Sequence, residues 1–321
     1  MRSIAHALLA LSLAWLAFQA PGPFWVEIQG VLGILLITVL TRTVSAEAAL
    51  SALGLGVGVA APCMILLGHG LAAIGIDPGD SPANWTIVAV LEELVKFLPV
   101  LFLSARLWRT FRVTFNPSDW LLLGFAAGTG FALIENTLLI QESPGVASDM
   151  RLHYGPHLGD WYLVPGAWGA AGYVGHGAAT GFIAGGIGLS LWLRRSGTKM
   201  PFPFWAPGVA ACGWIVVEHA LANLHVSTGS DATFILGNGR LTPWFYLALA
   251  ATVIVIDGRR ARASLGRSPM LRKRLGMLKA ALLRTKPPVP KSRVAVARML
   301  ASQVRLLNAA AWFVDQKGSR G

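Results

Sequence analysis

Long apolar runs constrain this chain more than any other feature of its sequence. Several of them exceed the roughly 18 residues that cross the hydrocarbon core of a bilayer. Hydrophobic residues make up 54% of the 321 positions, whereas charged residues make up only 13%. We therefore predict an all-α fold, a polytopic membrane helical bundle of about eight transmembrane helices. The predicted spans cover about residues 4–20, 25–41, 48–76, 85–106, 119–140, 165–193, 205–225 and 242–257.

The distribution of Lys and Arg between the connections predicts how these spans are oriented. Cytoplasmic loops of membrane proteins are enriched in basic residues, and here basic-rich and basic-poor connections alternate. With Arg2 placed inside, only Arg151 and Arg240 fall outside, and Lys96 lies within the membrane. Both termini are therefore predicted to be cytoplasmic.

The two ends of the chain differ from the membrane core. Residues 1–20 resemble a signal peptide, but the bulky Phe18 makes a poor cleavage site, which favours a retained helix. Residues 258–321 hold 16 of the 27 Lys and Arg and contain leucines at helical spacing, as amphipathic helices on anionic lipids do. A partly ordered solubilising tail is the alternative. We divide the chain into a transmembrane domain, 1–257, with a motif-bearing core at 85–225, and a basic amphipathic cytoplasmic tail, 258–321.

Three ionisable residues, Glu92, Glu93 and Lys96, lie in the middle of the fourth apolar segment. Each costs roughly 2.5–3.5 kcal/mol to insert, so we expect them to face protein or water rather than lipid. One helical turn separates Glu92 from Lys96, which predicts a pair, whereas Glu93 points about 100° away toward a different partner. A purely structural Glu92–Lys96 pair is the alternative, but it leaves Glu93 unexplained.

Polar residues of three further spans lie at comparable depth in the outer half of the predicted bundle. At 1.5 Å per residue from the span ends, they lie about 3–18 Å beneath the outer surface. Together with Glu92 and Glu93 they supply three glutamates, two histidines and the amide of Asn223, which can activate water, protonate a leaving amine and hold an oxyanion. The residues are Glu135 and Asn136, with Phe131 one turn before, then His176 and Thr180, then His219 and Asn223.

The order and spacing of these residues resemble the PrsW intramembrane proteases, relatives of the CAAX-prenyl protease and bacteriocin-processing superfamily. The resemblance implies an endopeptidase of the bacterial inner membrane, in which a glutamate activates water to hydrolyse a peptide bond. It also implies a membrane-anchored protein substrate, an anti-sigma factor in some members. The matching motifs are Glu92-Glu93-x-x-Lys96, Gly130-Phe131-Ala132-Leu133-Ile134-Glu135-Asn136, His176 with Thr180-Gly181, and His219-x-x-x-Asn223.

Residue types and resemblance together suggest a role for each polar group. Glu92 or Glu93 is the predicted general base, with a preference for Glu93 because Lys96 can neutralise Glu92. Glu135 and His176 are expected to orient water or shuttle protons. His219 and Asn223 are expected to stabilise the oxyanion. The predicted catalytic residues are Glu92, Glu93, Glu135, His176, His219 and Asn223, and the predicted supporting residues are Lys96, Phe131, Asn136 and Thr180.

The residue types leave metal dependence open. Histidine and carboxylate ligands suit zinc, and His176, His219, Glu93 and Glu135 would supply them. However, the chain has no His-Glu-x-x-His motif, and the ligands would come from separate helices. We therefore expect no cofactor, with zinc as the alternative.

Two rival functions fit the same polar residues. An inactive scaffold or substrate-binding relative would keep them for structure, and a proton-coupled transporter would use a Glu/His relay. The chain shows no internal repeat of the kind that many transporters have. Its basic charge alone suits nucleic acid, but no aromatic platform accompanies it. We therefore expect a protein substrate and anionic lipids, and no nucleic acid, as partners.

Other small and polar residues are expected to serve packing. The glycine-rich runs at 54–58, 124–130 and 181–188 are typical of helix faces that approach closely in lipid. Cys63 and Cys212 are interpreted as small buried hydrophobic residues, with no disulfide. A structural or secondary role is also the simplest interpretation of Glu27, His69 and Glu218.

Overall fold

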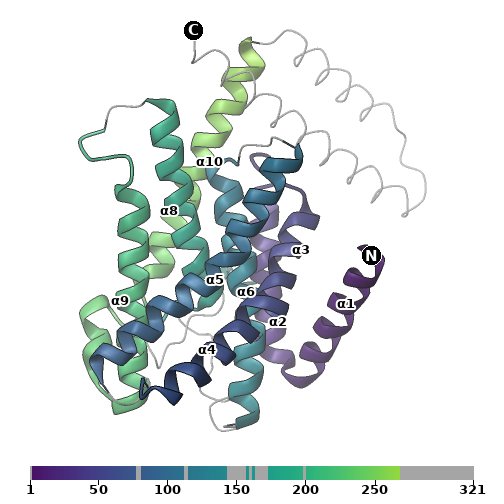
Figure 1. Ribbon diagram of the computed structural model, residues 1–321. Helices are drawn as coiled ribbons and strands as arrows, with labels where there is room; N and C mark the ends of the chain where they lie inside the picture. Colours follow the sequence, from purple (N-terminus) through teal and green to yellow (C-terminus); the bar gives the residue numbers. More distant parts are fainter. Residues whose placement is uncertain are drawn as a thin grey trace.

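The computed structural model describes residues 2–76, 81–111, 115–142, 157–158, 161–162, 173–197 and 200–267. These ranges are almost entirely helical, which confirms the predicted all-α class (Figure 1). A π-helical turn, η1 (Gly56–Ala60), joins α3 and α4, and two strands, β1 (His157–Leu158) and β2 (Trp161–Tyr162), pair antiparallel. The helices are α1 (Arg2–Gln19), α2 (Pro21–Ile37), α3 (Ala46–Leu55), α4 (Ala61–Ala73), α5 (Pro82–Phe111), α6 (Pro117–Glu142), α8 (His176–Ser196), α9 (Ala206–Thr228), η2 (Asp231–Leu236, 3-10) and α10 (Thr242–Arg267).

Three helical segments of the described chain are long and apolar enough to cross a membrane. They are Ala46–Ala73, Pro117–Gln141 and Ala206–Thr228, and they coincide with the predicted third, fifth and seventh spans. The apolar helices at Leu9–Gln19 and Pro21–Ile37 are shorter, and α5 carries three ionisable residues in its middle. The count of about eight spans therefore stays a prediction. The predicted amphipathic helices of the tail lie outside the described residues.

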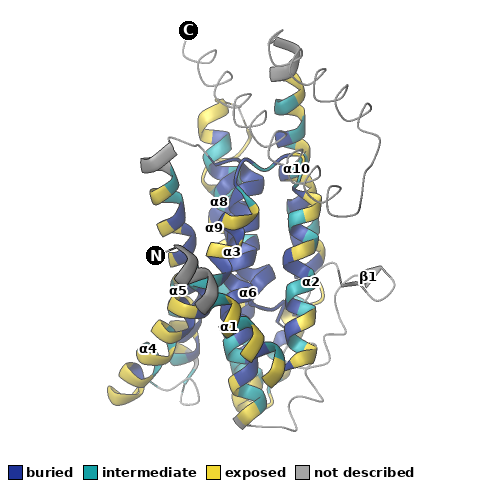
Figure 2. Ribbon diagram, turned by 90° about the vertical axis from the view of Figure 1, so that its right-hand side faces the viewer, coloured by how far each residue is buried: buried dark blue, intermediate teal, exposed yellow. Residues whose placement is uncertain are grey.

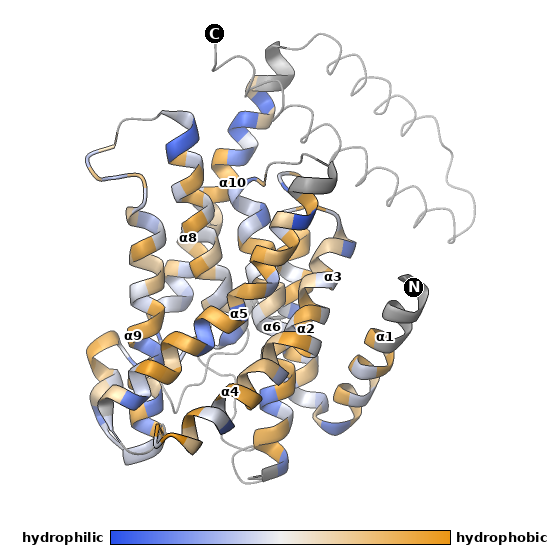
Figure 3. Cartoon of the chain, viewed as in Figure 1, coloured by the Kyte–Doolittle hydropathy of each residue, from blue (hydrophilic) through white to orange (hydrophobic). Residues whose placement is uncertain are grey.

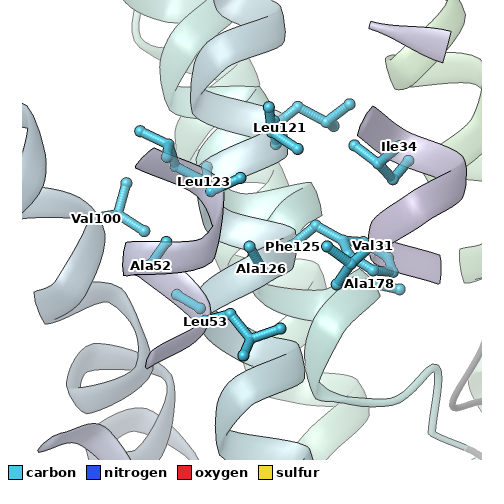
Figure 4. Packing of buried hydrophobic residues seen from close by; sticks show 14 of the residues in the cluster. Val31, Ile34, Ala52, Leu53, Val100, Leu121, Leu123, Phe125, Ala126 and Ala178 are labelled. Atoms are coloured by element: carbon cyan, nitrogen blue, oxygen red, sulfur yellow. The ribbon is translucent and has the colours of Figure 1, made fainter. Parts of the chain in front are cut away.

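Helix α6 forms the centre of the bundle. It packs against α8 most extensively and also contacts α2, α3, α5 and α10. Figure 2 shows α6 buried along most of its length, whereas α1 and α4 expose many residues. The core includes Leu121, Leu123 and Phe125 of α6, with Val31 of α2 and Leu53 of α3 beside them (Figure 4). Exposed side chains such as Phe18 and Leu66 are apolar, as expected of a surface that faces lipid.

Glycines allow α6 to approach its neighbours closely, as the sequence predicted. A Cβ added to Gly128 would lie 2.2 Å from the backbone oxygen of His176 in α8. A Cβ at Gly130 would lie 2.1 Å from the oxygen of Leu53 in α3, and one at Gly56 would lie 2.2 Å from that of Ala127. Side chains larger than hydrogen would therefore separate these backbones.

Buried carboxylates fix the end of the bundle where α6 begins. Asp119 accepts hydrogen bonds from the backbone N–H groups of Asn116, Thr43 and Val44, at 2.9, 2.7 and 3.1 Å. The Ser118 N–H donates to Asp257 of α10 at 2.9 Å. These contacts join α6 to α10 and to the segment before α3. They lie at the opposite end of α6 from Glu135.

Two expectations about local structure are wrong. Cys63 and Cys212 are free, as expected, but both are exposed rather than buried, because they lie on the apolar outer faces of α4 and α9. The sixth span was expected to carry His176 well inside a helix. Instead, α8 begins at His176, because Gly175 before it has a φ of +86°, a backbone conformation that favours glycine.

Candidate active site

Lys96 lies at the centre of a buried polar cluster between α5, α8 and α9. Its side chain is fully buried, and its Nζ donates to Glu93 Oε1 at 2.6 Å and to Glu92 Oε1 at 3.1 Å. Glu93 has a partner of its own, as predicted, because its Oε1 lies 2.9 Å from His219 Nδ1. The prediction missed that the long Lys96 side chain reaches both carboxylates. The ammonium is closer to Glu93 than to Glu92. The reason given for preferring Glu93 as the base therefore does not hold.

His176 connects this cluster to α6. Its Nδ1 lies 2.7 Å from Lys96 Nζ and 3.3 Å from Glu92 Oε1, and its Nε2 contacts Glu135 Oε2. An ammonium only donates hydrogen bonds, so Nδ1 accepts and the proton of a neutral imidazole lies on Nε2, facing Glu135. Because His176 is the first residue of α8, the start of that helix fixes its ring beside Phe131 (centroids 5.1 Å apart).

His219 approaches the two carboxylates from α9. Its Nδ1 lies 2.9 Å from Glu93 Oε1, and its Nε2 lies 3.6 Å from Glu92 Oε2. The rings of His176 and His219 have centroids 5.8 Å apart. The structure thus brings together five of the sequence-predicted residues, Glu92, Glu93, Lys96, His176 and His219, and Glu135 joins them through His176.

Tyr173 belongs to this cluster although the sequence did not single it out. Its hydroxyl donates to Glu93 Oε1 at 3.0 Å and lies 3.4 Å from both Lys96 Nζ and His176 Nδ1. Its ring stacks on that of His219, with centroids 4.7 Å apart and planes 28° apart. The only signal in the sequence was proximity, because Tyr173 lies three residues before His176, with Gly175 between them. That spacing does not identify a helical face, so helical periodicity could not find it.

The structure does not bring three other predicted residues into the cluster. Among the described residues, no hydrogen bond joins the side chain of Asn223, Asn136 or Thr180 to it. Asn223 is half-buried on α9, and the Asn136 side chain is buried with its Oδ1 unpaired within the described chain. Thr180 is buried where α8 crosses Gly128 of α6, so it serves the close contact between the two helices.

Two further carboxyl groups lie next to the cluster. Glu218, the neighbour of His219, accepts a hydrogen bond from Trp214 Nε1 at 3.2 Å and one from the Thr242 hydroxyl, so it joins α9 to α10. Glu27 of α2 is buried and accepts from Thr129 Oγ1 at 3.3 Å. Both carboxyl groups thus join helices, whereas His69 is exposed.

Glu92, Glu93 and His176 have the geometry of a possible metal site. Each offers one ligand atom, and these atoms lie within 4.8 Å of one another. Carboxylate oxygen and imidazole nitrogen are ligands that zinc takes in proteins. Lys96 Nζ contacts the same three side chains.

Comparison with known proteins places the chain in a family. Residues 45–256 match the family model described as PrsW family intramembrane metalloprotease. No curated protein and no solved structure matches the chain. The match covers most of the chain, including the helices that hold the polar cluster. The chain therefore belongs to the PrsW family of intramembrane metalloproteases, and is a peptidase of the membrane.

Proposed function

We propose that this protein is an intramembrane endopeptidase in which Glu93 activates the attacking water. The proposal rests on an asymmetry in the Glu93 carboxylate. Oε1 is contacted by Lys96, Tyr173 and His219 at 2.6, 3.0 and 2.9 Å. Oε2 is buried, and no hydrogen bond reaches it from the described residues. Three contacts thus hold one oxygen, and the other remains to accept a proton.

The remaining polar groups supply the other steps of peptide hydrolysis. Glu93 Oε2 takes a proton from water, the resulting hydroxide attacks the carbonyl carbon, and the carboxylic acid returns the proton to the leaving amine. His219 is the donor for the charge that develops on the carbonyl oxygen, through the N–H of Nε2 in the doubly protonated ring, since Nδ1 faces Glu93 Oε1. His176 and Glu135 form the path by which the cluster exchanges protons, since the Glu135 side chain is 31% exposed. Asn223 was predicted to stabilise the oxyanion, and that role now requires its half-buried side chain to turn toward the cluster.

The name of the family implies a metal ion, and Glu92, Glu93 and His176 are the residues that would hold it. Their chemistry suits zinc, because two carboxylates and an imidazole converge. However, the Lys96 ammonium lies within 3.1 Å of an atom of each of the three side chains. A second cation at that point would repel it across a buried site. The cluster as described therefore does not fit a metal ion together with a charged Lys96, and no step above passes through one.

The proposal extends to topology and substrate. We propose about eight spans with both termini in the cytoplasm of a bacterium, and the cluster in the outer half of the inner membrane. Residues 1–257 would form the protease domain, and residues 258–321 a tail that contacts anionic lipids. The substrate class is a membrane-anchored protein, for which an anti-sigma factor is one example.

A cleavage assay tests this function. Cells that express the wild-type chain or Glu93→Gln are compared for a single-pass membrane protein that changes size only with the wild type. The purified chain must then cleave that protein. A scaffold would bind the protein and leave it intact, and a transporter would instead move protons under a pH gradient. Binding without cleavage, or proton movement without cleavage, by the purified chain would refute the proposal.

A further inference from the structure

An apolar groove opens on the side of the bundle formed by α8, α9 and α10. Its volume is about 340 Å³, at the lower end of the range of ligand pockets. Its lining is almost wholly apolar and includes Phe182 and Gly186 of α8, Ala210 and Trp214 of α9, and Phe245 of α10. Neighbouring side chains such as Val209 are exposed and apolar, so this side of the bundle faces lipid.

Arginines of α8 and α10 gather at one end of these two helices. Arg194 at the end of α8 lies over the ring of Phe204, which precedes α9, with its Cζ 5.7 Å from the ring centroid. Arg195 lies close enough to Arg194 and to Arg260 of α10 for their positive charges to repel. Figure 3 shows hydrophilic residues at this end of α8 and α10 and apolar ribbon below them. The nearby acid, Asp257, is buried, accepts from Ser118 and attracts Arg260, so the excess of positive charge lies at Arg194 and Arg195.

The groove and the arginines are separated by the length of one lipid leaflet. Arg194 follows Gly186 by eight positions in α8, and Arg260 follows Leu249 by eleven positions in α10. At 1.5 Å per residue these stretches are about 12 and 16 Å long. Half of a hydrocarbon core of about 30 Å is about 15 Å. A lipid with its phosphate at the arginines would thus place its acyl chain in the groove.

We propose that this groove binds an acyl chain of an anionic phospholipid, whose phosphate pairs with Arg194 and Arg195. Basic pockets between transmembrane helices recognise anionic head groups in this way. Arginine is suited to the contact, because its planar guanidinium can donate two hydrogen bonds to phosphate. The site is separate from the polar cluster and does not depend on the catalytic role proposed for Glu93.

Lipid binding to the full-length chain tests this site. The chain is placed in nanodiscs of phosphatidylcholine with a minority of phosphatidylglycerol of the same acyl chains, and native mass spectrometry measures the lipids that stay bound after release. We expect phosphatidylglycerol to be retained at least tenfold above its share. The double variant Arg194→Gln/Arg195→Gln should lose most of this enrichment, whereas Arg106→Gln, an exposed arginine of α5, should keep it.

A second variant separates the groove from other basic surfaces. Ala210→Phe fills the groove and should also remove the enrichment, whereas Val209→Phe, on the adjacent exposed position, should not. Thermal unfolding of each variant checks that it folds. If phosphatidylglycerol remains enriched in folded Ala210→Phe or in the double variant, the lipid binds elsewhere, for example at the basic residues after 267, and the proposal is wrong.

Discussion

The Tyr173 hydroxyl donates a hydrogen bond of 3.0 Å to Glu93 Oε1 across 80 positions of the sequence. The same tyrosine stacks its ring on His219, which also contacts Glu93 Oε1. One aromatic side chain therefore positions a carboxylate of α5 and an imidazole of α9. It lies just before α8, where Gly175 turns the chain. The polar cluster is thus held by a residue outside its helices as well as by residues on them.

The two glutamates of α5 should differ in their contribution to catalysis. We expect Glu93→Gln to lower kcat about 10²–10⁴-fold, because an amide cannot take a proton from water. Glu92→Gln should cost about tenfold, since an amide oxygen still accepts from Lys96. Initial rates on a purified membrane-anchored substrate measure both. A larger loss from Glu92→Gln than from Glu93→Gln would reverse the assignment of the base.

Removing the Tyr173 hydroxyl should slow the chemical step without weakening substrate binding. Tyr173→Phe keeps the ring on His219 but removes a donor to a charged carboxylate, a contact worth about 1.5–3 kcal/mol. We expect kcat to fall about ten- to hundredfold with KM unchanged. Tyr173→Leu, which also loses the ring, should lose more activity and some thermal stability. An unchanged kcat in Tyr173→Phe, with a lower unfolding temperature, would show that the tyrosine serves structure alone.

Lys96 should hold the site together and keep metal out. Lys96→Met leaves two buried carboxylates without their cation, so we expect the free energy of unfolding to fall by about 3–5 kcal/mol. The same variant should gain zinc, because the ligand atoms of Glu92, Glu93 and His176 lose the competing charge. Metal content of both purified proteins, measured by mass spectrometry, checks this. Stoichiometric zinc in the wild type, removed by a chelator together with activity, would show that Lys96 leaves the site.

The closest contact between α6 and α8 should not tolerate a methyl group. Gly128→Ala places a Cβ 2.2 Å from the His176 oxygen, so the helices must separate at the site. We expect a loss of about 1–3 kcal/mol in the free energy of unfolding and a fall in activity. Gly213→Ala is the matched control on α9, because its Cβ would meet nothing within 4 Å. Thermal unfolding in detergent compares them, and equal unfolding temperatures would refute the prediction.

Much of the site could be predicted because transfer of its ionisable side chains into lipid is energetically unfavourable. Ionisable side chains such as Glu93, Lys96 and His176 stand out in an apolar sequence, and counting from the span ends placed them at similar depth. Glycines such as Gly128 were likewise interpretable as contact positions. Partners within the cluster were less predictable. Lys96 reaches Glu93 more closely than Glu92, because a long flexible side chain is not bound to one helical face.

The sequence by itself determined the helical class, the residues that must avoid lipid and the family motifs, because these follow from local hydrophobicity and spacing. Only the tertiary structure decided which polar groups meet. It joined Tyr173 to Glu93, His176 to Glu135 and His219 to both glutamates, and it left Asn223 and Thr180 outside the hydrogen-bonded cluster. The physical reason is that such contacts depend on helix rotation, on the point where α8 begins and on close glycine packing, none of which a single helical period specifies.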